Sequence, residues 1–167
     1  MYGVGVIVLV SLLTFIIFRH SPDWNAQEII GYASIVASLI FVYLGILRYR
    51  EKENGGQLSF GKGLGVGTLI TLFPSVAFGL FSWLQMSILD PGYADKYYGY
   101  YSEKLRRSTP PPELEAALKE LAAEKAFFSN PIAQFLVMFL TVFVIGIIIT
   151  LISTLILKKN KPHIISR

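Results

Sequence analysis

The chain has 167 residues, of which 53% are hydrophobic, and its mean hydropathy is +0.55. This composition leaves little sequence for a separate soluble domain, so we expect one membrane domain over residues 1–167. Cysteine is absent, which excludes disulfides, thiolate metal ligands and cysteine nucleophiles. The formal net charge of +4 is modest, and the positions of the basic residues are more informative than their number.

Four long apolar segments predict an all-α, polytopic membrane protein. A helix needs about 20 mostly apolar residues to cross the hydrocarbon layer, because each residue rises about 1.5 Å through a thickness of about 30 Å. No ionisable side chain lies deep within any of the segments. We therefore expect four transmembrane helices, over about Tyr2–Phe18, Ile29–Leu47, Leu64–Leu89 and Ile132–Leu157.

The first apolar segment is expected to be a retained helix rather than a signal peptide. No basic residue precedes it. The residues that follow, Arg19-His20-Ser21-Pro22, do not form a small-residue cleavage site. Gly3 and Gly5 near its start would let another helix approach closely.

Lysine and arginine are densest in the connector after the second segment and in the tail after the fourth. Because cytoplasmic connectors carry an excess of these residues, this distribution places both termini in the cytoplasm. The alternative is the opposite insertion of the first helix, which Arg19-His20 would favour after an uncharged N-terminus. The basic residues expected to anchor helix ends at the membrane interface are Arg48, Arg50, Lys52, Lys158 and Lys159.

Glycines recur at every second position at the start of the third segment, from Gly61 through Gly63 and Gly65 to Gly67. Their spacing fits neither the phosphate loop nor the dinucleotide fingerprint. On a helix they form two interleaved GxxxG pairs, which predicts close packing against another helix. The alternative is a lipid-headgroup or anion site around Lys62 and the helix N-terminus.

Pro74 interrupts the third segment and removes a backbone hydrogen bond, so we expect a kink there. Thr71 and Ser75 are placed to satisfy the freed groups. Whether the kink gates a motion or is purely architectural stays open. Asn130-Pro131 is expected to cap and open the fourth helix.

Residues 90–130 form the one sizeable segment outside the predicted spans, and we expect an outer helical hairpin broken at Pro110-Pro111-Pro112. In its first half, Tyr93, Tyr97 and Tyr101 share a helical face, which favours an aromatic belt at the membrane surface. Binding of sugars or peptides by these tyrosines is the alternative.

The second half of this hairpin has the periodicity of an amphipathic helix. Leu114, Leu118, Leu121 and Phe128 are expected to turn toward the membrane or a partner. Glu115, Lys119, Glu120 and Glu124 would then face water. Together with the three tyrosines, the apolar residues form a predicted partner surface.

Several segments in a fixed order resemble a bacterial family known as domain of unknown function 4199. They are Glu28–Ala33, Gly45–Arg50, Gly56–Lys62, Gly65–Gly67, Asn130-Pro131 and Gly146–Lys159. The resemblance implies a four-span inner-membrane protein with a glycine-rich third helix and a basic end, and it implies no activity. Members tend to begin with basic residues, which this chain lacks, and many have an acid and a proline in the last span, where it has Thr141 and Val144.

The residues offer little support for catalysis. His20 and His163 are the two histidines, and the predicted topology places them on opposite sides of the membrane. No spacing suits a metal site or a Ser-His-Asp arrangement, so we expect no enzyme, no cofactor, no metal and no nucleic-acid partner.

We expect instead a non-catalytic accessory or scaffolding module that packs against lipid, another membrane protein or a second copy of itself. The alternative is a small oligomeric transporter or channel for a neutral or lipid-like substrate, because the spans carry hydroxyls rather than charges.

Overall fold

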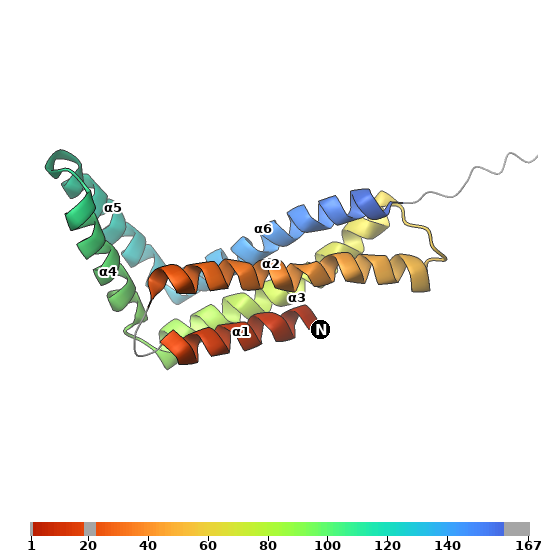
Figure 1. Ribbon diagram of the computed structural model, residues 1–167, viewed down its shortest axis with the longest axis horizontal. Helices are drawn as coiled ribbons and strands as arrows, with labels where there is room; N and C mark the ends of the chain where they lie inside the picture. The colour runs from red at the N-terminus through yellow and green to blue at the C-terminus, as the bar shows by residue number, and fades with distance from the viewer. Residues whose placement is uncertain (1, 19–22, 159–167) are drawn as a thin grey trace, which may run out of the picture. The chain divides into compact units, whose positions relative to one another are not determined.

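The computed structural model describes residues 2–18 and 23–158, and helices make up most of them (Figure 1). Contacts divide the chain into two compact units. Unit 1 comprises Met1–Phe78 with Leu140–Arg167, and unit 2 comprises Gly79–Phe139. The helices in chain order are α1 (Tyr2–Phe18), α2 (Trp24–Arg48), η1 (Tyr49–Glu53), α3 (Phe60–Leu84), η2 (Gln85–Leu89), α4 (Tyr93–Ser108), α5 (Pro111–Phe128) and α6 (Pro131–Leu157).

Three of the described helical segments are long and apolar enough to cross a membrane. They are Trp24–Glu53, Phe60–Leu89 and Pro131–Leu157, and a shorter apolar stretch, Val8–Ile17, lies within α1. The predicted all-α class is thereby confirmed, and these helices are those of a multi-pass membrane protein. That α1 is a fourth complete span stays a prediction, because its apolar stretch is shorter than the other three.

The second and third helices extend beyond the predicted spans at their ends. α2 begins at Trp24 rather than Ile29, because Asp23 caps it: the Ala26 N–H donates to Asp23 Oδ1 at 3.0 Å. η1 continues α2 by one wider, π-helical turn. Its residues are polar, so a span predicted from apolar residues ended before them. α3 begins at Phe60 rather than Leu64, so the glycine-rich segment is part of the helix.

The connector between η1 and α3 turns at two glycines. Gly55 and Gly56 have φ angles of 60° and 74°, the left-handed region that other residues rarely adopt. The Asn54 side-chain amide donates to the Gln57 carbonyl at 2.6 Å and holds the turn. The predicted turn at Asn54-Gly55-Gly56 is therefore present.

α2 is apolar on both its inner and outer faces. Its inner side chains Leu39 and Ile46 are fully buried in a core completed by Leu58 and Val142. Its outer side chains recur at helical spacing and are about half exposed, at 52% for Val36, 56% for Ile40 and 45% for Leu44. A helix that is apolar all round is typical of a membrane span.

Several hydroxyl side chains lie in the interior of unit 1. Thr71 and Ser75 of α3 and Thr150 and Thr154 of α6 are fully buried. In contrast, α6 exposes a row of aliphatic side chains: Val144, Ile148, Ile152 and Leu155. Hydroxyl groups inside and aliphatic groups outside are the arrangement expected of helices surrounded by lipid, because lipid cannot satisfy a polar group.

In unit 2, α4 and α5 pack as an antiparallel hairpin (Figure 1). The predicted break is confirmed: Pro110 has an extended backbone, with φ −59° and ψ 148°, and α5 begins at Pro111. Proline is tolerated there because the first turn of a helix lacks backbone acceptors for its N–H groups. The predicted cap of α6 is also present, since Asn130 Oδ1 accepts the N–H groups of Ile132 at 2.9 Å and Ala133 at 3.3 Å.

Candidate functional site

Glycines and threonines of α3 and α6 face one another in unit 1, and this contact is here called the Gly–Thr seam. Its members are Gly63, Gly67 and Thr71 on α3, opposite Thr154, Thr150 and Gly146 on α6. A Cβ atom added to Gly63 would lie 2.6 Å from Thr154 Cγ2, and one added to Gly67 would lie 2.7 Å from Thr150 Oγ1. Atoms cannot approach so closely, so each glycine leaves room for the threonine it faces.

The seam is reciprocal, because the last of its three contacts exchanges the residue types. Gly146 is on α6, and a Cβ atom there would lie 2.9 Å from Thr71 Oγ1 on α3. On each helix the three members recur at every fourth residue, which places them on one face. The pairing runs in opposite directions along the two helices, so α3 and α6 are antiparallel.

The hydroxyl groups of the seam make few side-chain hydrogen bonds. The Thr71 and Thr150 Oγ1 atoms are 3.5 Å apart. Thr154 Oγ1 is buried without a hydrogen-bond partner among the described residues. Contacts between backbone Cα–H groups and hydroxyl oxygens are only weak interactions. Close van der Waals packing therefore stabilises the α3–α6 contact more than hydrogen bonding does.

Ser75 lies within the helix next to Pro74. Its hydroxyl donates to the Thr71 carbonyl at 2.8 Å, which is the usual back-bond of a serine within a helix. The carbonyl that Pro74 leaves without its helical donor is that of Ile70, so the Ser75 bond does not replace the missing one. The predicted kink and its role stay predictions.

The other two predicted packing glycines lie on a different face of α3. A Cβ atom added to Gly61 or Gly65 would meet no described atom within 4 Å. The neighbouring Lys62 donates to Asn54 Oδ1 at 3.1 Å and so contacts the preceding turn. Of the two interleaved pairs, Gly63 and Gly67 are therefore the pair that contacts α6.

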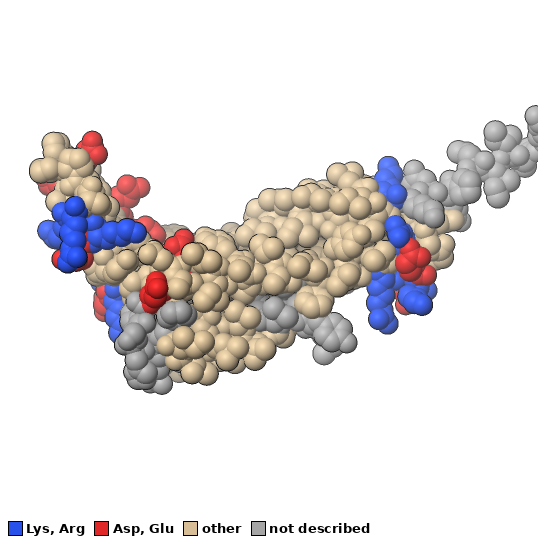
Figure 2. Space-filling model, viewed as in Figure 1, with Lys and Arg blue, Asp and Glu red and all other residues tan. Residues whose placement is uncertain are grey.

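The predicted interface anchors gather at the end of unit 1 that carries η1, next to an uncharged surface along the helices (Figure 2). Arg48, Lys52 and Lys158 are exposed, and Lys159 lies outside the described residues. Arg50 Nη1 donates to the Leu157 carbonyl at 3.2 Å, and its Nε donates to Glu51 Oε1 at 2.7 Å. Arg50 thus stabilises the C-terminus of α6, where carbonyl groups lack helical donors.

The rings of the predicted tyrosine face of unit 2 contact one another along α4, and this row is here called the tyrosine stack. The ring centroids of Tyr93 and Tyr97 are 6.2 Å apart, and those of Tyr97 and Tyr101 are 4.7 Å apart. Lys104 Nζ lies 5.5 Å from the Tyr101 centroid, within the range of a cation–π contact.

Sequence reasoning missed Tyr98, which is 7% exposed and is the buried residue of α4. Its hydroxyl donates to Glu124 Oε1 of α5 at 3.4 Å. Burial raises the pKa of Tyr98 to about 12, and the Glu124 carboxylate contributes. Burial likewise raises the pKa of Tyr93 to about 12, with Asp90 and Tyr101 adding to the effect.

A salt bridge also joins the two helices of the hairpin: Asp95 Oδ1 of α4 lies 2.6 Å from Lys125 Nζ of α5. The hydrogen bond and the charge of Lys125 lower the pKa of Asp95. Both side chains are solvent-exposed at 40% or more, so this pair contributes little to stability.

The predicted apolar face of α5 is partly covered. Its four members, Leu114, Leu118, Leu121 and Phe128, are each half-buried. Glu115, Lys119 and Glu120 are exposed as predicted. Glu124 is also exposed as predicted, and it accepts a hydrogen bond from the Tyr98 hydroxyl because α4 packs against α5.

Among residues 2–18 and 23–158, no group of three or more histidine, cysteine, aspartate or glutamate side chains could hold a metal ion. His20 and His163 lie outside the described residues.

Residues 1–159 match the family described as "Protein of unknown function (DUF4199)". The chain belongs to the DUF4199 family. This confirms the resemblance noted in the sequence, whose segments lie in order over nearly the whole chain. No curated protein and no solved structure matches the chain, and the family description assigns no activity.

Proposed function

We propose that this DUF4199 protein is a non-catalytic module of the bacterial inner membrane that packs against lipid or another membrane protein. The observation that carries the proposal is the distribution of side chains in unit 1, with hydroxyl and glycine residues inside and aliphatic residues outside. Burial of one such aliphatic side chain is worth about 1.5–3 kcal/mol. The outer rows of α2 and α6 therefore strongly favour a lipid or protein neighbour over water.

The proposed topology has four spans, counting α1, with both termini cytoplasmic and the hairpin of α4 and α5 on the outer side. The basic end of unit 1, with Arg48, Lys52 and Lys158, supports this orientation.

Labelling of single cysteines in intact cells tests the topology. Because the chain lacks cysteine, Ser108→Cys in the exposed end of α4 and Ser166→Cys in the tail each introduce one thiol. A membrane-impermeant maleimide should label Ser108→Cys in intact cells, and should label Ser166→Cys after the membrane is opened. The reverse pattern would refute the orientation. Labelling of both from outside would refute the even number of spans.

The proposed partner surface is the half-buried apolar face of α5 together with the tyrosine stack of α4. Crosslinking in native membranes followed by purification should recover a stoichiometric partner. The double variant Leu118→Glu, Leu121→Glu should abolish that recovery. The matched control, Ala122→Glu with Ala123→Glu, adds the same charge at two exposed positions of α5 and should retain it. Recovery from both variants would place the interface elsewhere, on the membrane helices.

The second candidate is a small oligomeric transporter or channel for a neutral or lipid-like substrate, because the spans carry hydroxyls rather than charges. The tight contacts at Gly63 and Gly67 leave no room for a substrate between α3 and α6, so a path would need a subunit interface. Solute flux across liposomes that contain the purified protein distinguishes this candidate from a packing module, for which none is expected.

A further inference from the structure

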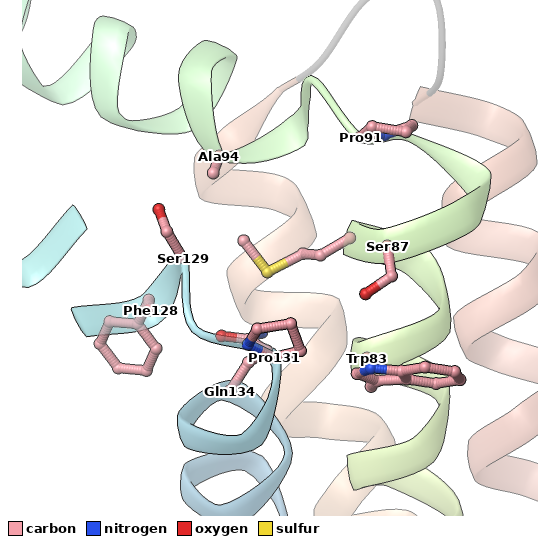
Figure 3. Close-up of a pocket in the computed structure, with 9 residues that line it drawn as sticks. Trp83, Ser87, Pro91, Ala94, Phe128, Ser129, Pro131 and Gln134 are labelled. Atoms are coloured by element: carbon pink, nitrogen blue, oxygen red, sulfur yellow. The ribbon is translucent and has the colours of Figure 1, made fainter. Parts of the chain in front are cut away.

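Unit 2 contains a pocket of about 120 Å³ where the end of α3, η2, the start of α4, the end of α5 and the start of α6 meet (Figure 3). Trp83 and Ser87 lie on one side, and Phe128, Pro131 and Gln134 lie on the other. Most of its wall is aromatic or aliphatic, and the polar groups in it are hydroxyls and one amide.

The amide belongs to Gln134, which is 8% exposed and lines the pocket. Its amide carries two donors and an acceptor. The amide atoms are not among the fully buried unpaired atoms of the described residues, so they keep accessible surface while the residue lines the pocket. A group that enters the pocket can therefore exchange hydrogen bonds with this amide.

Two further hydroxyls offer hydrogen bonds in the same pocket. Ser129 Oγ donates to the Lys125 carbonyl at 2.7 Å, which leaves its oxygen free to accept. Ser87 is exposed at the opposite wall. The pocket thus combines donors and acceptors, as a hydroxyl or ester ligand requires.

The lining contains no charged side chain. The nearest acid in sequence, Asp90, is already paired with Lys96, whose Nζ lies 2.9 Å from its Oδ2. A phosphate or carboxylate would be desolvated here without a cation, which is unfavourable. The ligand is therefore a neutral group.

The volume limits the group further. An apolar cavity of about 150 Å³ in another protein holds one benzene molecule, so this pocket admits a segment of similar size and no complete lipid. Trp83 is 38% exposed, and Leu80, one turn earlier on α3, is 51% exposed. These side chains extend the apolar wall of the pocket outward, along the surface that an acyl chain would follow.

We propose that this pocket binds the neutral glycerol–ester group of a membrane acylglycerol. Gln134 exchanges hydrogen bonds with the hydroxyl and ester oxygens, Trp83 and Phe128 enclose the first carbons, and the acyl chain leaves over Leu80. This inference rests on the membrane location in the proposed function and is independent of the packing role.

Photolabelling of the full-length protein in dodecyl maltoside tests the pocket. The probe is a monoacylglycerol with a diazirine on its acyl chain, and labelled peptides are mapped by mass spectrometry. We expect labels within Leu80–Ser87 and Phe128–Gln134, and competition by monoolein but not by oleate or hexadecane. Equal competition by hexadecane would reveal a merely apolar surface, and equal competition by oleate would contradict the neutral ligand. Either result overturns the proposal.

Substitutions separate ligand binding from folding. Gln134→Leu should weaken monoolein competition about five- to tenfold, the worth of about one hydrogen bond, and thermal unfolding without ligand should show that the variant stays folded. The matched control is Gln85→Leu, which changes an amide that does not line the pocket and should leave competition unchanged. Unchanged competition in Gln134→Leu would overturn the proposal, while topology labelling and partner recovery would remain valid tests of the proposed function.

Discussion

The Gly–Thr seam of unit 1 and the α4–α5 hairpin of unit 2 are both antiparallel helix pairs, but different side chains hold them. The seam pairs glycine with threonine at distances that admit no additional Cβ atom. The hairpin instead buries Tyr98, stacks rings along α4 and joins Asp95 to Lys125 across its two helices. One pair depends on close backbones, and the other depends on large side chains.

The difference follows from the surroundings of each pair. Between helices in lipid, apolar burial provides little driving force, because lipid chains are as apolar as leucine, so close van der Waals contact dominates. A hairpin in water gains free energy by removing large aromatic groups from solvent. The two units therefore predict opposite responses to substitution: the seam is sensitive to added volume and the hairpin to removed volume.

The largest total effect is expected when volume is added at two sites of the seam together. Gly67→Leu with Gly146→Leu should destabilise the protein by about 1–3 kcal/mol at each site, because threonine and backbone atoms must move apart. Thermal unfolding in detergent measures the loss. The control, Gly61→Leu with Gly65→Leu, places the same volume where no described atom lies within 4 Å, and it should unfold at close to the parental temperature. An equal fall in melting temperature in the two double variants would contradict the close α3–α6 contact at Gly67 and Gly146.

Removed volume should instead open the hairpin. Tyr98→Ala deletes a buried ring, and deletions of this kind cost about 3–5 kcal/mol in well-packed cores. Hydrogen exchange of the α4 and α5 amides should accelerate, with little change in α2. Tyr98→Phe keeps the ring and loses only a long hydrogen bond of 3.4 Å, so it should behave nearly as the parent. Slow exchange in Tyr98→Ala would show that the ring does not hold the hairpin.

Alkaline pH should weaken the same hairpin by a smaller amount. The pKa of Tyr98 is about 12 in the folded protein, against 10.0 for an ordinary tyrosine. Below pH 10 the Tyr98 hydroxyl is protonated in both the folded and the unfolded protein, so its full contribution to the free energy of unfolding is present. That contribution is lost as pH rises toward 12, because the unfolded protein loses the proton first. Exchange of α4 amides, corrected for intrinsic rates, should accelerate over that window. Tyr98→Phe should show a shallower dependence, and the remainder belongs to Tyr93, whose pKa is raised similarly.

The smallest effect is expected at the exposed ion pair. Asp95→Asn removes the partner of Lys125 on the surface, where water and salt screen the attraction. The pKa of Asp95 is lowered in the folded protein, so the contribution of the pair is present above the ordinary carboxylate pKa and is lost as pH falls through the folded value. Amide exchange of α4 in Asp95→Asn should match the parent at 0.5 M NaCl, and a clear acceleration there would show that this pair, rather than Tyr98, holds the hairpin.

The local features of this protein could be predicted from the sequence. Long apolar runs predicted the membrane helices, Asn130-Pro131 predicted a cap, and Pro110-Pro111-Pro112 predicted the break in the hairpin. Each of these depends on residues within one or two turns of each other, through backbone hydrogen bonding and helical geometry.

Features that depend on a neighbouring helix were not predictable in the same way. Gly61 and Gly65 have the same spacing as Gly63 and Gly67, so spacing alone does not select the pair that faces α6. The matching four-residue spacing of Gly146, Thr150 and Thr154 was a signal that could have indicated the partner.

Tyr98 and Gln134 illustrate the same limit at single residues. Five tyrosines lie close together in α4, and the packing of α5 selects which of them is buried. Gln134 resembles an ordinary polar residue in a membrane helix until segments distant in sequence enclose it in a pocket. Helix formation depends on near neighbours along the chain, whereas a buried face or pocket depends on which distant side chains pack against it.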